Sequence, residues 1–355
     1  MKFINPSAKV FRHLDRVVAW QQGQKAAPVT VEWDLSNRCV LGCQDCHFAH
    51  THVRGPWASK ARTLPMAFDS TGDMANLNVV ARGLQEMARA GVQGVVWSGG
   101  GEPTTHPEWL SALTLASLAR LKQGMYTLGG LITKDEATVA AKLLDWVVVS
   151  LDAVDAETYA KEKGVPPLRF KNALGGVQML AAGQTTVGVS FLLHGANWLV
   201  LDRMLELSRS LGAAYTTFRP AIQVSQAMPD VCTEDRSWIT EALPKLVELS
   251  EEPDVEVDPY RFVQYRDWNG HGYTACQGVK FNTTITPDGR VWLCPQRRGV
   301  GDSIGNLNDE SFGDIWARHP GNFSVDRGCR VMCRLHPVNQ TLDSLTKAQV
   351  HSEFV

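Results

Sequence analysis

Three cysteines near the N-terminus have the residue type and the spacing of metal ligands. Cys39, Cys43 and Cys46 are separated by three and then by two residues. A zinc site or an ordinary iron–sulfur cluster takes four protein ligands. A loop that supplies only three thiolates leaves one metal position open, and an open iron of a [4Fe–4S] cluster can chelate a small molecule. A zinc loop and a chance grouping of cysteines are the alternatives.

A glycine-rich segment follows the next predicted strand. Gly99, Gly100 and Gly101 precede Glu102 and Pro103. Glycine lets the backbone approach a ligand closely, and a carboxylate beside it can accept hydrogen bonds from an ammonium group. A tight turn between a strand and a helix is the alternative interpretation.

The two motifs together resemble the CxxxCxxC and GGEP signatures of the radical S-adenosylmethionine (SAM) enzymes. The resemblance implies that the three cysteines form the catalytic centre and hold a [4Fe–4S] cluster whose open iron binds SAM. It also implies that Gly100, Gly101 and Glu102 hold the amino group of SAM. The reduced cluster would cleave SAM to a 5′-deoxyadenosyl radical, with electrons from an external donor of the flavodoxin or ferredoxin type.

Polar residues also follow two later predicted strands. The family often has side chains at the position of Ser150 and Asp152 that bond the ribose of SAM, so the resemblance implies that role here. Capping of the next helix is an equal alternative, and Asp155 is as good a cap. Asn197 is either a ligand contact or, as we favour, a helix cap.

The segment after the third cysteine carries candidate ligand contacts. The family usually has an aromatic residue just before that cysteine, near the adenine of SAM, but Asp45 stands there. We therefore expect Phe48 to make the adenine contact. His50, His52 and Arg54 follow, and we expect them to bind substrate, with Arg54 gripping a phosphate or carboxylate. A solvated loop is the alternative.

A second group of cysteines lies in the last quarter of the chain: Cys276, Cys294, Cys329 and Cys333. A glycine five residues before Cys294 and the close final pair resemble the twitch form of the SPASM auxiliary-cluster domain. The resemblance implies a second [4Fe–4S] cluster with four thiolates and no open iron. A structural zinc site is the alternative. Cys232 is left over, and we interpret it as an ordinary thiol.

Composition limits the class of protein. The chain has 355 residues, of which 44% are hydrophobic, and a formal net charge of −2. This balance gives no sign of a large nucleic-acid or membrane surface. No apolar run is long enough to span a membrane, and the N-terminus lacks a signal-peptide core. We therefore predict a cytoplasmic protein, in the host cytoplasm if a phage encodes it, where clustered cysteines hold metal rather than disulfides.

Strands and helices alternate along the first two thirds of the chain. Apolar and β-branched runs predict six strands, at 29–33, 94–98, 125–128, 145–151, 186–193 and 214–219. Such alternation predicts an α/β fold with a parallel sheet. Six units fit the open, TIM-like partial (β/α)6 barrel of the radical SAM family, with the chemistry at the carboxyl ends of the strands.

Three segments are expected. Residues 1–27 form a helical extension, residues 28–225 the barrel, and residues 226–355 a linker helix with a small α+β iron–sulfur domain. The last segment includes a predicted β-hairpin, with strands at 281–286 and 290–293. In the extension a helix is expected over 7–22, with Arg16 pointing away from its apolar face. That face is formed by Val10, Phe11, Leu14, Val17 and Val18.

The substrate is less well defined than the chemistry. The segment from Cys46 to Gly55 resembles bacteriophage radical SAM isomerases of thymidine hypermodification, which implies N- to C-linked rearrangement of an amino-acid-modified thymine in DNA or a nucleotide. A peptide-modifying maturase and a dehydrogenase of a small alcohol are the alternatives. The short stretch before Cys39 argues mildly against a leader-binding maturase. A non-catalytic iron–sulfur binding or sensing protein is the alternative from another class.

Overall fold

A computed structural model describes most of the chain. The described residues are 9–43, 46, 53–54, 74–222, 234–298, 303–325, 329 and 332–346. The candidate residues Phe48, His50 and His52 lie outside this set, as does Cys232. Arg54 belongs to a described strand by its backbone alone.

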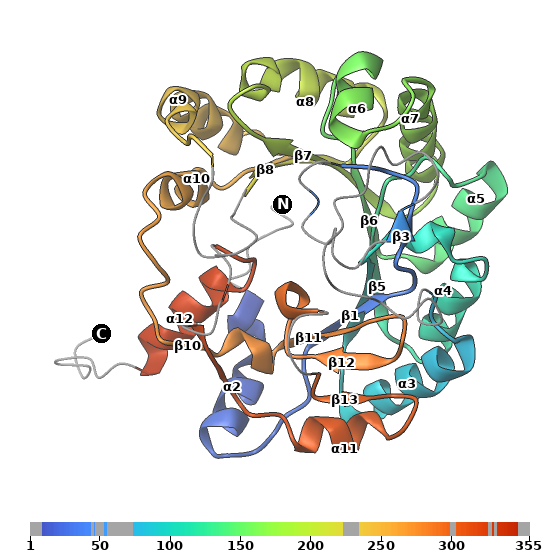
Figure 1. The fold of residues 1–355 in the computed structure, drawn as a ribbon, viewed down its shortest axis with the longest axis vertical. Coiled ribbons are helices and arrows are strands. Elements are labelled where there is room, and N and C mark those ends of the chain that lie inside the picture. Colours follow the sequence, from blue (N-terminus) through green and yellow to red (C-terminus); the bar gives the residue numbers. More distant parts are fainter. Residues whose placement is uncertain are drawn as a thin grey trace.

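Six parallel strands form the wall of a partial barrel (Figure 1). Each pairs in parallel with its neighbour, as the apolar runs predicted. The largest difference is at the third strand, which begins at Lys122 instead of Met125, while the other boundaries agree to within one residue. The six strands are β1 (Thr30–Asp34), β4 (Gly94–Ser98), β5 (Lys122–Thr127), β6 (Trp146–Ser150), β7 (Thr186–Leu193) and β8 (Tyr215–Pro220).

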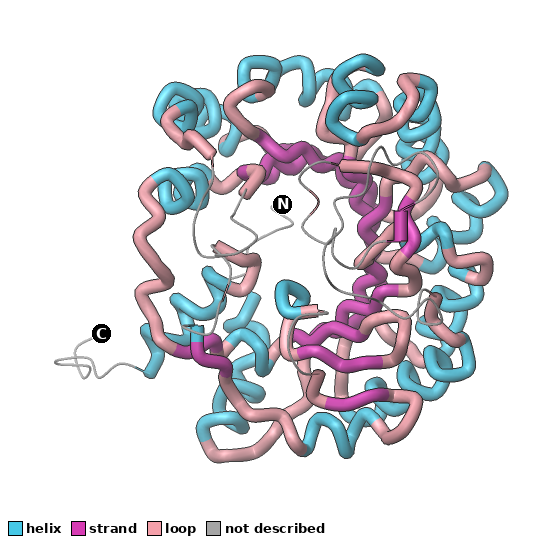
Figure 2. The backbone as a smooth tube through the Cα atoms, in the orientation of Figure 1, coloured by secondary structure: helices cyan, strands magenta, loops and turns pink. Residues whose placement is uncertain are grey.

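Helices cover the outer face of this wall (Figure 2). At the start of the first helix, the Asn76 side chain accepts a hydrogen bond from Asn78 N; the helix is followed by Gly91, which has a φ of 96°. Thr133 and Glu136 form a capping box in the third. In order they are α3 (Leu77–Ala90), α4 (Trp109–Leu118), α5 (Lys134–Leu143), α6 (Ala156–Lys163), α7 (Leu168–Ala181) and α8 (Leu201–Ser210).

The C-terminal part extends both ends of the same sheet. Beside β8 lies β9 (Val255–Glu256), and beside β1 lies β11 (Asn282–Ile285), both in parallel. The predicted hairpin is confirmed, since β12 (Arg290–Trp292) pairs antiparallel with β11 through a turn at Gly289, where φ is 83°. Next comes β13 (Gly305–Asn306). Among the described strands the order ends at β13 and β9, so the barrel is open.

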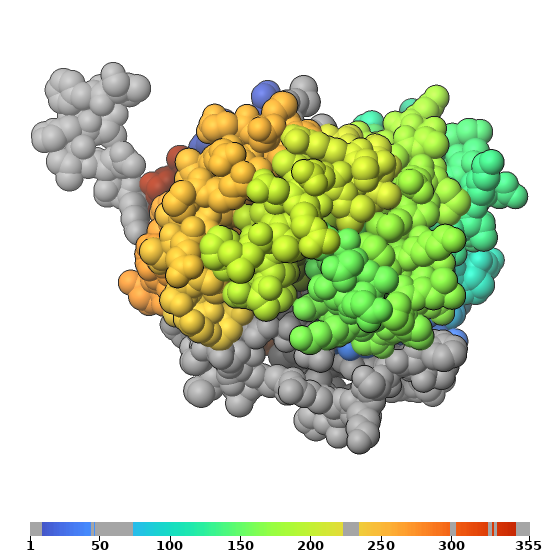
Figure 3. Space-filling view, turned by 90° about the horizontal axis from the view of Figure 1, so that it is seen from above, coloured from blue at the N-terminus to red at the C-terminus, as the bar shows by residue number. Residues whose placement is uncertain are grey.

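The remaining C-terminal elements surround the opening. Seen from above, the yellow and orange segments of α9 and α10 lie beside the green and yellow-green helices of the barrel (Figure 3). The predicted connecting helix is confirmed as α9. The elements are α9 (Trp238–Ser250), α10 (Pro259–Arg266), β10 (Ala275–Cys276), α11 (Phe312–Ala317), β14 (Phe323–Ser324) and α12 (His336–Thr346).

The sheet has two chemically different faces because strand side chains alternate. In β1, Val31 and Trp33 are buried against the helices, and Trp33 lies against Gly83 of α3. Glu32 and Asp34 belong to the other, concave face. The core therefore sits between the sheet and its helices, and the concave face is left for polar groups. No described helix is long and apolar enough to cross a membrane.

The N-terminal helix differs from the prediction. It consists of a 3-10 turn at Phe11–His13 and of α2 (Leu14–Gln21). Val10 and Val17 are buried, but Phe11, Leu14 and Val18 are about half exposed. Arg16, expected to point away, is buried instead.

The change at Arg16 has a hydrogen-bonding cause. Its guanidinium donates to the carbonyl oxygens of Ala27 and Gly91, and to that of Pro28 at 3.1 Å. These carbonyls lie before β1 and after α3, so the arginine satisfies backbone groups that the helix and strand leave unpaired.

Two adjacent glycines of α7 test how closely the helix packs on the sheet. A Cβ at Gly176 would lie 2.1 Å from the carbonyl oxygen of Gly129, whereas a Cβ at Gly175 would meet nothing within 4 Å. We expect Gly176→Ala to destabilise the protein by about 1–3 kcal/mol through overpacking. Gly175→Ala should stabilise it by about 0.5–1 kcal/mol. Thermal unfolding followed by circular dichroism measures both, and equal shifts of the two variants would contradict this packing.

Candidate functional site

The three N-terminal cysteines lie just beyond the carboxyl end of β1. Cys39 ends the short β2 (Arg38–Cys39), which pairs with β3 (Val53–Arg54). Cys39 is buried, Cys43 and Cys46 are half-buried, and all three are free thiols. Burial raises the pKa of Cys39, and the charges of Glu102, Cys43 and Cys46 raise it further. Such thiols become thiolates when a metal takes the place of the proton, so this donor set fits a metal centre.

The cysteine loop is held from the side by the end of α6. The N–H of Gly42 donates to the carbonyl of Lys163 at 2.7 Å, and a Cβ at Gly164 would lie 2.8 Å from the Gly42 carbonyl oxygen. Gly164 has a φ of 61°, which suits glycine. The close contact places the loop against the carboxyl ends of β1 and β6.

The glycine segment lies against the other side of the same loop. Gly101 N donates to Ser36 O at 2.9 Å, and Glu102 N donates to Arg38 O at 2.8 Å. A Cβ at Gly101 would lie 2.2 Å from Arg38 O. Only glycine fits there, so the GGEP segment and the first cysteine are brought together as the motifs predicted.

The Glu102 carboxylate is buried and already oriented by donors. Oε1 accepts from Thr104 N at 3.1 Å, from Thr104 Oγ1 at 2.6 Å and from Thr127 Oγ1 at 2.6 Å. Oε2 accepts from Leu128 N at 2.8 Å. Burial raises the pKa of Glu102, and these hydrogen bonds oppose the shift. A carboxylate has about four lone-pair sites. Oε2 therefore keeps capacity for an ammonium group, which fits the amino group of SAM.

Asp152 follows β6 and is engaged in the protein itself. It has a φ of 61°, accepts from Leu192 N at 2.7 Å and forms an ion pair with Lys163. Burial alone would lower the pKa of Lys163, but Asp152 raises it. Asp155, and not Asp152, caps α6 by accepting from Thr158 N. Ser150, two residues earlier, ends β6 at the same edge.

Asn197 is buried and holds its own loop. Its Oδ1 accepts from His194 N at 2.9 Å, and its Nδ2 donates to Leu192 O at 2.9 Å. It precedes the 3-10 helix at Trp198–Val200 but makes no side-chain cap there. The expectation of a helix cap was wrong because both ends of the amide are used within the loop that follows β7.

The four C-terminal cysteines converge. They are free thiols, and they pack with buried residues such as Tyr273 and Val279 in a small cluster of their own. Burial, together with the charges of neighbouring cysteines, raises the pKa of Cys294 and Cys333 to about 12. The converging thiols fit a metal centre with four thiolates.

The spacing of these thiols bears on the zinc alternative. Four thiolates on one zinc ion, at about 2.3 Å each, require closely spaced sulfur atoms. Within the described residues, no three His, Cys, Asp or Glu side chains are arranged to hold one metal ion.

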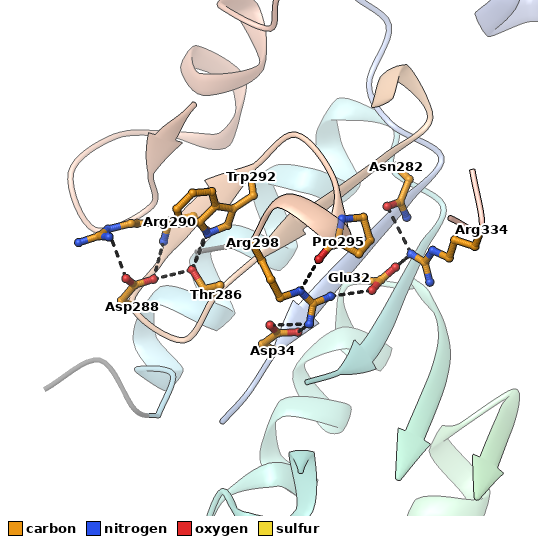
Figure 4. Close-up of polar contacts among 10 residues, drawn as sticks. All are labelled: Glu32, Asp34, Asn282, Thr286, Asp288, Arg290, Trp292, Pro295, Arg298 and Arg334. Atoms are coloured by element: carbon orange, nitrogen blue, oxygen red, sulfur yellow. Dashed lines mark hydrogen bonds and ion pairs between the residues drawn. The ribbon is translucent and has the colours of Figure 1, made fainter. Parts of the chain in front are cut away.

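A buried charge network joins the two cysteine regions, and the sequence reasoning missed it (Figure 4). Arg298 is fully buried; its Nη1 lies 2.7 and 2.8 Å from the two Asp34 oxygens, and its Nη2 lies 2.9 Å from Glu32 Oε2. Arg334 forms an ion pair with Glu32 from the other side. Arg298 follows Cys294 closely and Arg334 is next to Cys333, so the network connects the auxiliary cysteines to β1.

The same network reaches the glycine motif. Burial raises the pKa of Asp34 to about 6, even though the Arg298 guanidinium and the backbone N–H of Gly100 both lower it by favouring the charged carboxylate. The sequence does contain one signal for this network: Glu32 and Asp34 alternate in the strand that leads into the cysteine loop. Their partners are more than 260 residues away, at separations of 264 and 266.

Comparison with known proteins defines the class. Residues 33–207 match the radical SAM superfamily, and residues 276–333 match SPASM, an iron–sulfur cluster-binding domain. The fold and the three-thiol loop after its first strand agree with both matches. The chain therefore carries a radical SAM domain followed by a C-terminal SPASM-type domain.

Several curated relatives differ in activity. A probable GTP 3′,8-cyclase of Methanosarcina mazei is 29% identical over 55% of this chain and 54% of its own length. The AdoMet-dependent heme synthase of Methanosarcina barkeri is 26% identical over 82% of both chains. Mycofactocin maturase MftC of Mycobacterium tuberculosis is 26% identical over 82% of this chain and 70% of its own. The chain thus spans about half the length of the first of these relatives.

The solved structures show the same fold. Streptococcus suis SuiB bound to precursor peptide SuiA has a TM-score of 0.63 at 16% identity, and the match covers 90% of this chain and 71% of SuiB. Radical SAM and SPASM membership implies a [4Fe–4S] cluster, SAM and auxiliary iron–sulfur binding.

The buried network gives a stability prediction. Arg298→Met would leave Asp34 and Glu32 buried without Arg298, so we expect a loss of about 3–5 kcal/mol in the free energy of unfolding. The control is Arg318→Gln, which breaks a two-oxygen contact with Glu310 at 2.7 Å on the surface. That exposed pair should cost less than about 1 kcal/mol. Urea unfolding of both variants measures the difference, and similar losses would contradict the role of Arg298.

Proposed function

We propose that this enzyme uses SAM-derived radical chemistry to modify a peptide. The observation that carries the proposal is the meeting of three groups around β1: the three-thiol loop, the oriented Glu102 carboxylate and the Arg298 link to the auxiliary cysteines. A maturase among the relatives and a precursor peptide bound to SuiB support the substrate class. When bound and reduced, the cluster and SAM supply a 5′-deoxyadenosyl radical that abstracts a substrate hydrogen.

The residues would divide the work as follows. Cys39, Cys43 and Cys46 hold the first cluster and leave one iron open. Glu102 accepts the SAM ammonium through Oε2, and the Gly100–Gly101 backbone lines the same place. The hydrogen-bond donors that orient the Glu102 carboxylate are in place before SAM binds, so little reorganisation is needed on binding.

Further residues are proposed to contact or shape the sites for the SAM ribose, the adenine and the substrate. Ser150 lies at the strand edge where the SAM ribose would lie, and Asp152 would shape that edge through its ion pair with Lys163. Phe48, His50, His52 and Arg54 stay proposals for contacts to adenine and substrate. The domain boundaries at residues 27 and 225 also stay proposals.

Cys276, Cys294, Cys329 and Cys333 would hold one auxiliary [4Fe–4S] cluster. With four thiolates it has no open iron, so it would serve electron transfer, substrate positioning or structure. Electrons for the first cluster would come from a flavodoxin or ferredoxin type of donor.

The three alternative functions have fewer observations in their favour than peptide modification has. Thymine isomerisation rests on one short motif, and none of the relatives described above is named for an activity on DNA or thymine. A small-alcohol dehydrogenase would use the auxiliary cluster as an electron acceptor, and no reported relative points to it by name. A non-catalytic iron–sulfur protein would have no use for the oriented Glu102 carboxylate.

The deciding experiment is release of 5′-deoxyadenosine by anaerobically loaded protein with SAM and dithionite. Parallel samples contain a pool of synthetic peptides, DNA bearing aminoacylated thymine, a set of small alcohols, or no substrate. We expect a burst with peptides alone. A burst only with the modified DNA would replace the peptide proposal with the isomerase one.

The cluster assignment can be tested by substitution. We expect the triple variant Cys39→Ala, Cys43→Ala, Cys46→Ala to lose SAM cleavage entirely and to lose one cluster's worth of iron, because three thiolates are removed together. Iron analysis and 5′-deoxyadenosine release measure the two effects. Retained cleavage would refute the central assignment.

The auxiliary site can be tested independently. Cys329→Ala should lower the iron content while SAM still binds to the first cluster, because Cys329 belongs to the separate C-terminal group. Metal analysis of the triple variant gives the companion test. Zinc in place of iron in that anaerobically purified protein would overturn the auxiliary-cluster assignment.

A further inference from the structure

A cavity of about 710 Å³ opens on the concave face of the barrel. Its strand-derived wall follows the two-residue period of β-strands: Trp146 and Val148 come from β6, and Tyr215, Thr217 and Arg219 come from β8. The opposite wall comes from α10 and the start of α12. The volume is in the range of small-molecule sites, about 300–1,000 Å³.

Glycines on neighbouring strands leave room for two aromatic rings of the cavity wall. A Cβ at Gly124 would lie 2.0 Å from the Trp146 ring, and a Cβ at Gly188 would lie 2.4 Å from the Tyr215 ring. Tyr126 meets the Trp146 ring edge to face at 5.2 Å. The Trp146 and Tyr215 rings therefore lie over the glycines of neighbouring strands, and together with Tyr126 they form an aromatic wall.

Two guanidinium groups face this cavity. Arg219 lies over the Tyr126 ring, 5.8 Å from its centre. Arg261 donates from Nη2 to Met332 O at 3.2 Å, while its Nε is buried without a hydrogen-bond partner. Among the described side chains, no carboxylate lies within 4.0 Å of the charged nitrogens of either arginine. Burial lowers the pKa of Arg261, and the charge of Arg219 lowers it further.

Four other charged groups of the cavity are engaged. Arg334 pairs with Glu32, and Asp145 accepts from Lys122 at 2.7 Å. Asp258 accepts from Tyr260 N at 3.1 Å and so caps α10. Glu256, which also lines the cavity, has partners of its own. Lys9 lies at the wall too.

We propose that Arg219 and Arg261 bind a single carboxylate of the substrate, whose flat apolar body lies against Tyr126, Trp146 and Tyr215. Arginine matches a carboxylate through paired N–H donors. The nearby acids Glu256 and Asp258 would repel a phosphate dianion more than a singly charged group. The inference rests on the proposed function, because it states how the barrel holds an acidic or C-terminal peptide residue.

The placement also gives an orientation. Met332, whose carbonyl accepts from Arg261, directly precedes Cys333. A carboxylate on Arg261 would therefore sit on the auxiliary-cysteine side of the cavity. The rest of the substrate would extend along β8 toward the carboxyl strand edge, where SAM is expected.

The test compares two probes that differ only in charge. N-acetyl-tyrosine carries the carboxylate, and N-acetyl-tyrosinamide does not. Both are titrated calorimetrically into cluster-loaded protein with SAM and no reductant, so that no turnover occurs. We expect the acid to bind at least about tenfold more tightly, since a charge-assisted hydrogen bond is worth about 1.5–3 kcal/mol, or about ten- to a hundredfold. Arg219→Gln and Arg261→Gln should each remove most of that preference.

A matched control is available at Arg236. It lies 5.6 Å from the centre of the Tyr265 ring and donates to Tyr265 O, but it does not line the cavity. Arg236→Gln should keep the preference for the acid. If a glutamine variant fails to fold, Arg219→Lys replaces it and should keep part of the preference, because the charge remains and the planar fork is lost.

Several results would overturn the inference. These are no measurable binding of the acid, equal affinity of acid and amide, or a preference that survives both glutamine substitutions. Tighter, arginine-dependent binding of phenyl phosphate would assign the site to phosphate instead. Because these titrations need no turnover, a failed peptide assay with an intact acid preference would reject peptide modification alone.

Discussion

The fully buried guanidinium of Arg298 is the interaction on which the arrangement of the two cysteine regions depends. It is bound to both acidic side chains of β1 and to the carbonyl of Pro295 at 3.0 Å. Removing a charge from water is expensive, and such a group persists only when its hydrogen-bonding capacity is filled by partners of opposite charge. The requirement ties the loop after Cys294 to the strand that leads into Cys39. The same strand, through Asp34, also comes close to the glycine motif, since the backbone N–H of Gly100 favours the charged form of that carboxylate.

This linkage is possible because the concave face of the sheet is polar. The helices take the apolar side of each strand, and the facing residues of β1 are left to bond with the C-terminal hairpin. Since β11 continues the sheet directly beside β1, the auxiliary cysteines and the strand edge proposed to bind SAM share one support. Glycines at positions such as 124 and 188 leave the remaining concave surface open enough for a cavity lined by aromatic rings.

Local chemistry accounts for the parts of the fold that the sequence predicted well. The six apolar runs became strands because each is short, rich in residues that favour strands and followed by a segment with helical periodicity. The N-terminal helix was less predictable. An apolar stripe was visible at Val10 and Val17, but Arg16 turned inward because unpaired carbonyls of distant segments lay within its reach. Similarly, Asn197 was assigned by its position after a strand, while its amide is in fact used by the adjacent loop.

The sequence by itself determined the class of chemistry and the order of the strands, because the cysteine spacing, the glycine–glutamate motif and the hydrophobic periodicity are local in the chain. Only the tertiary structure decided which distant residues meet. Asp34 and Arg298 are 264 residues apart, and Arg219 and Arg261 come from a strand and a helix that no short motif relates. Charge pairing and cavity shape arise from the way the sheet curves and closes around its C-terminal extension. They therefore cannot be inferred from residue types and spacing along the chain.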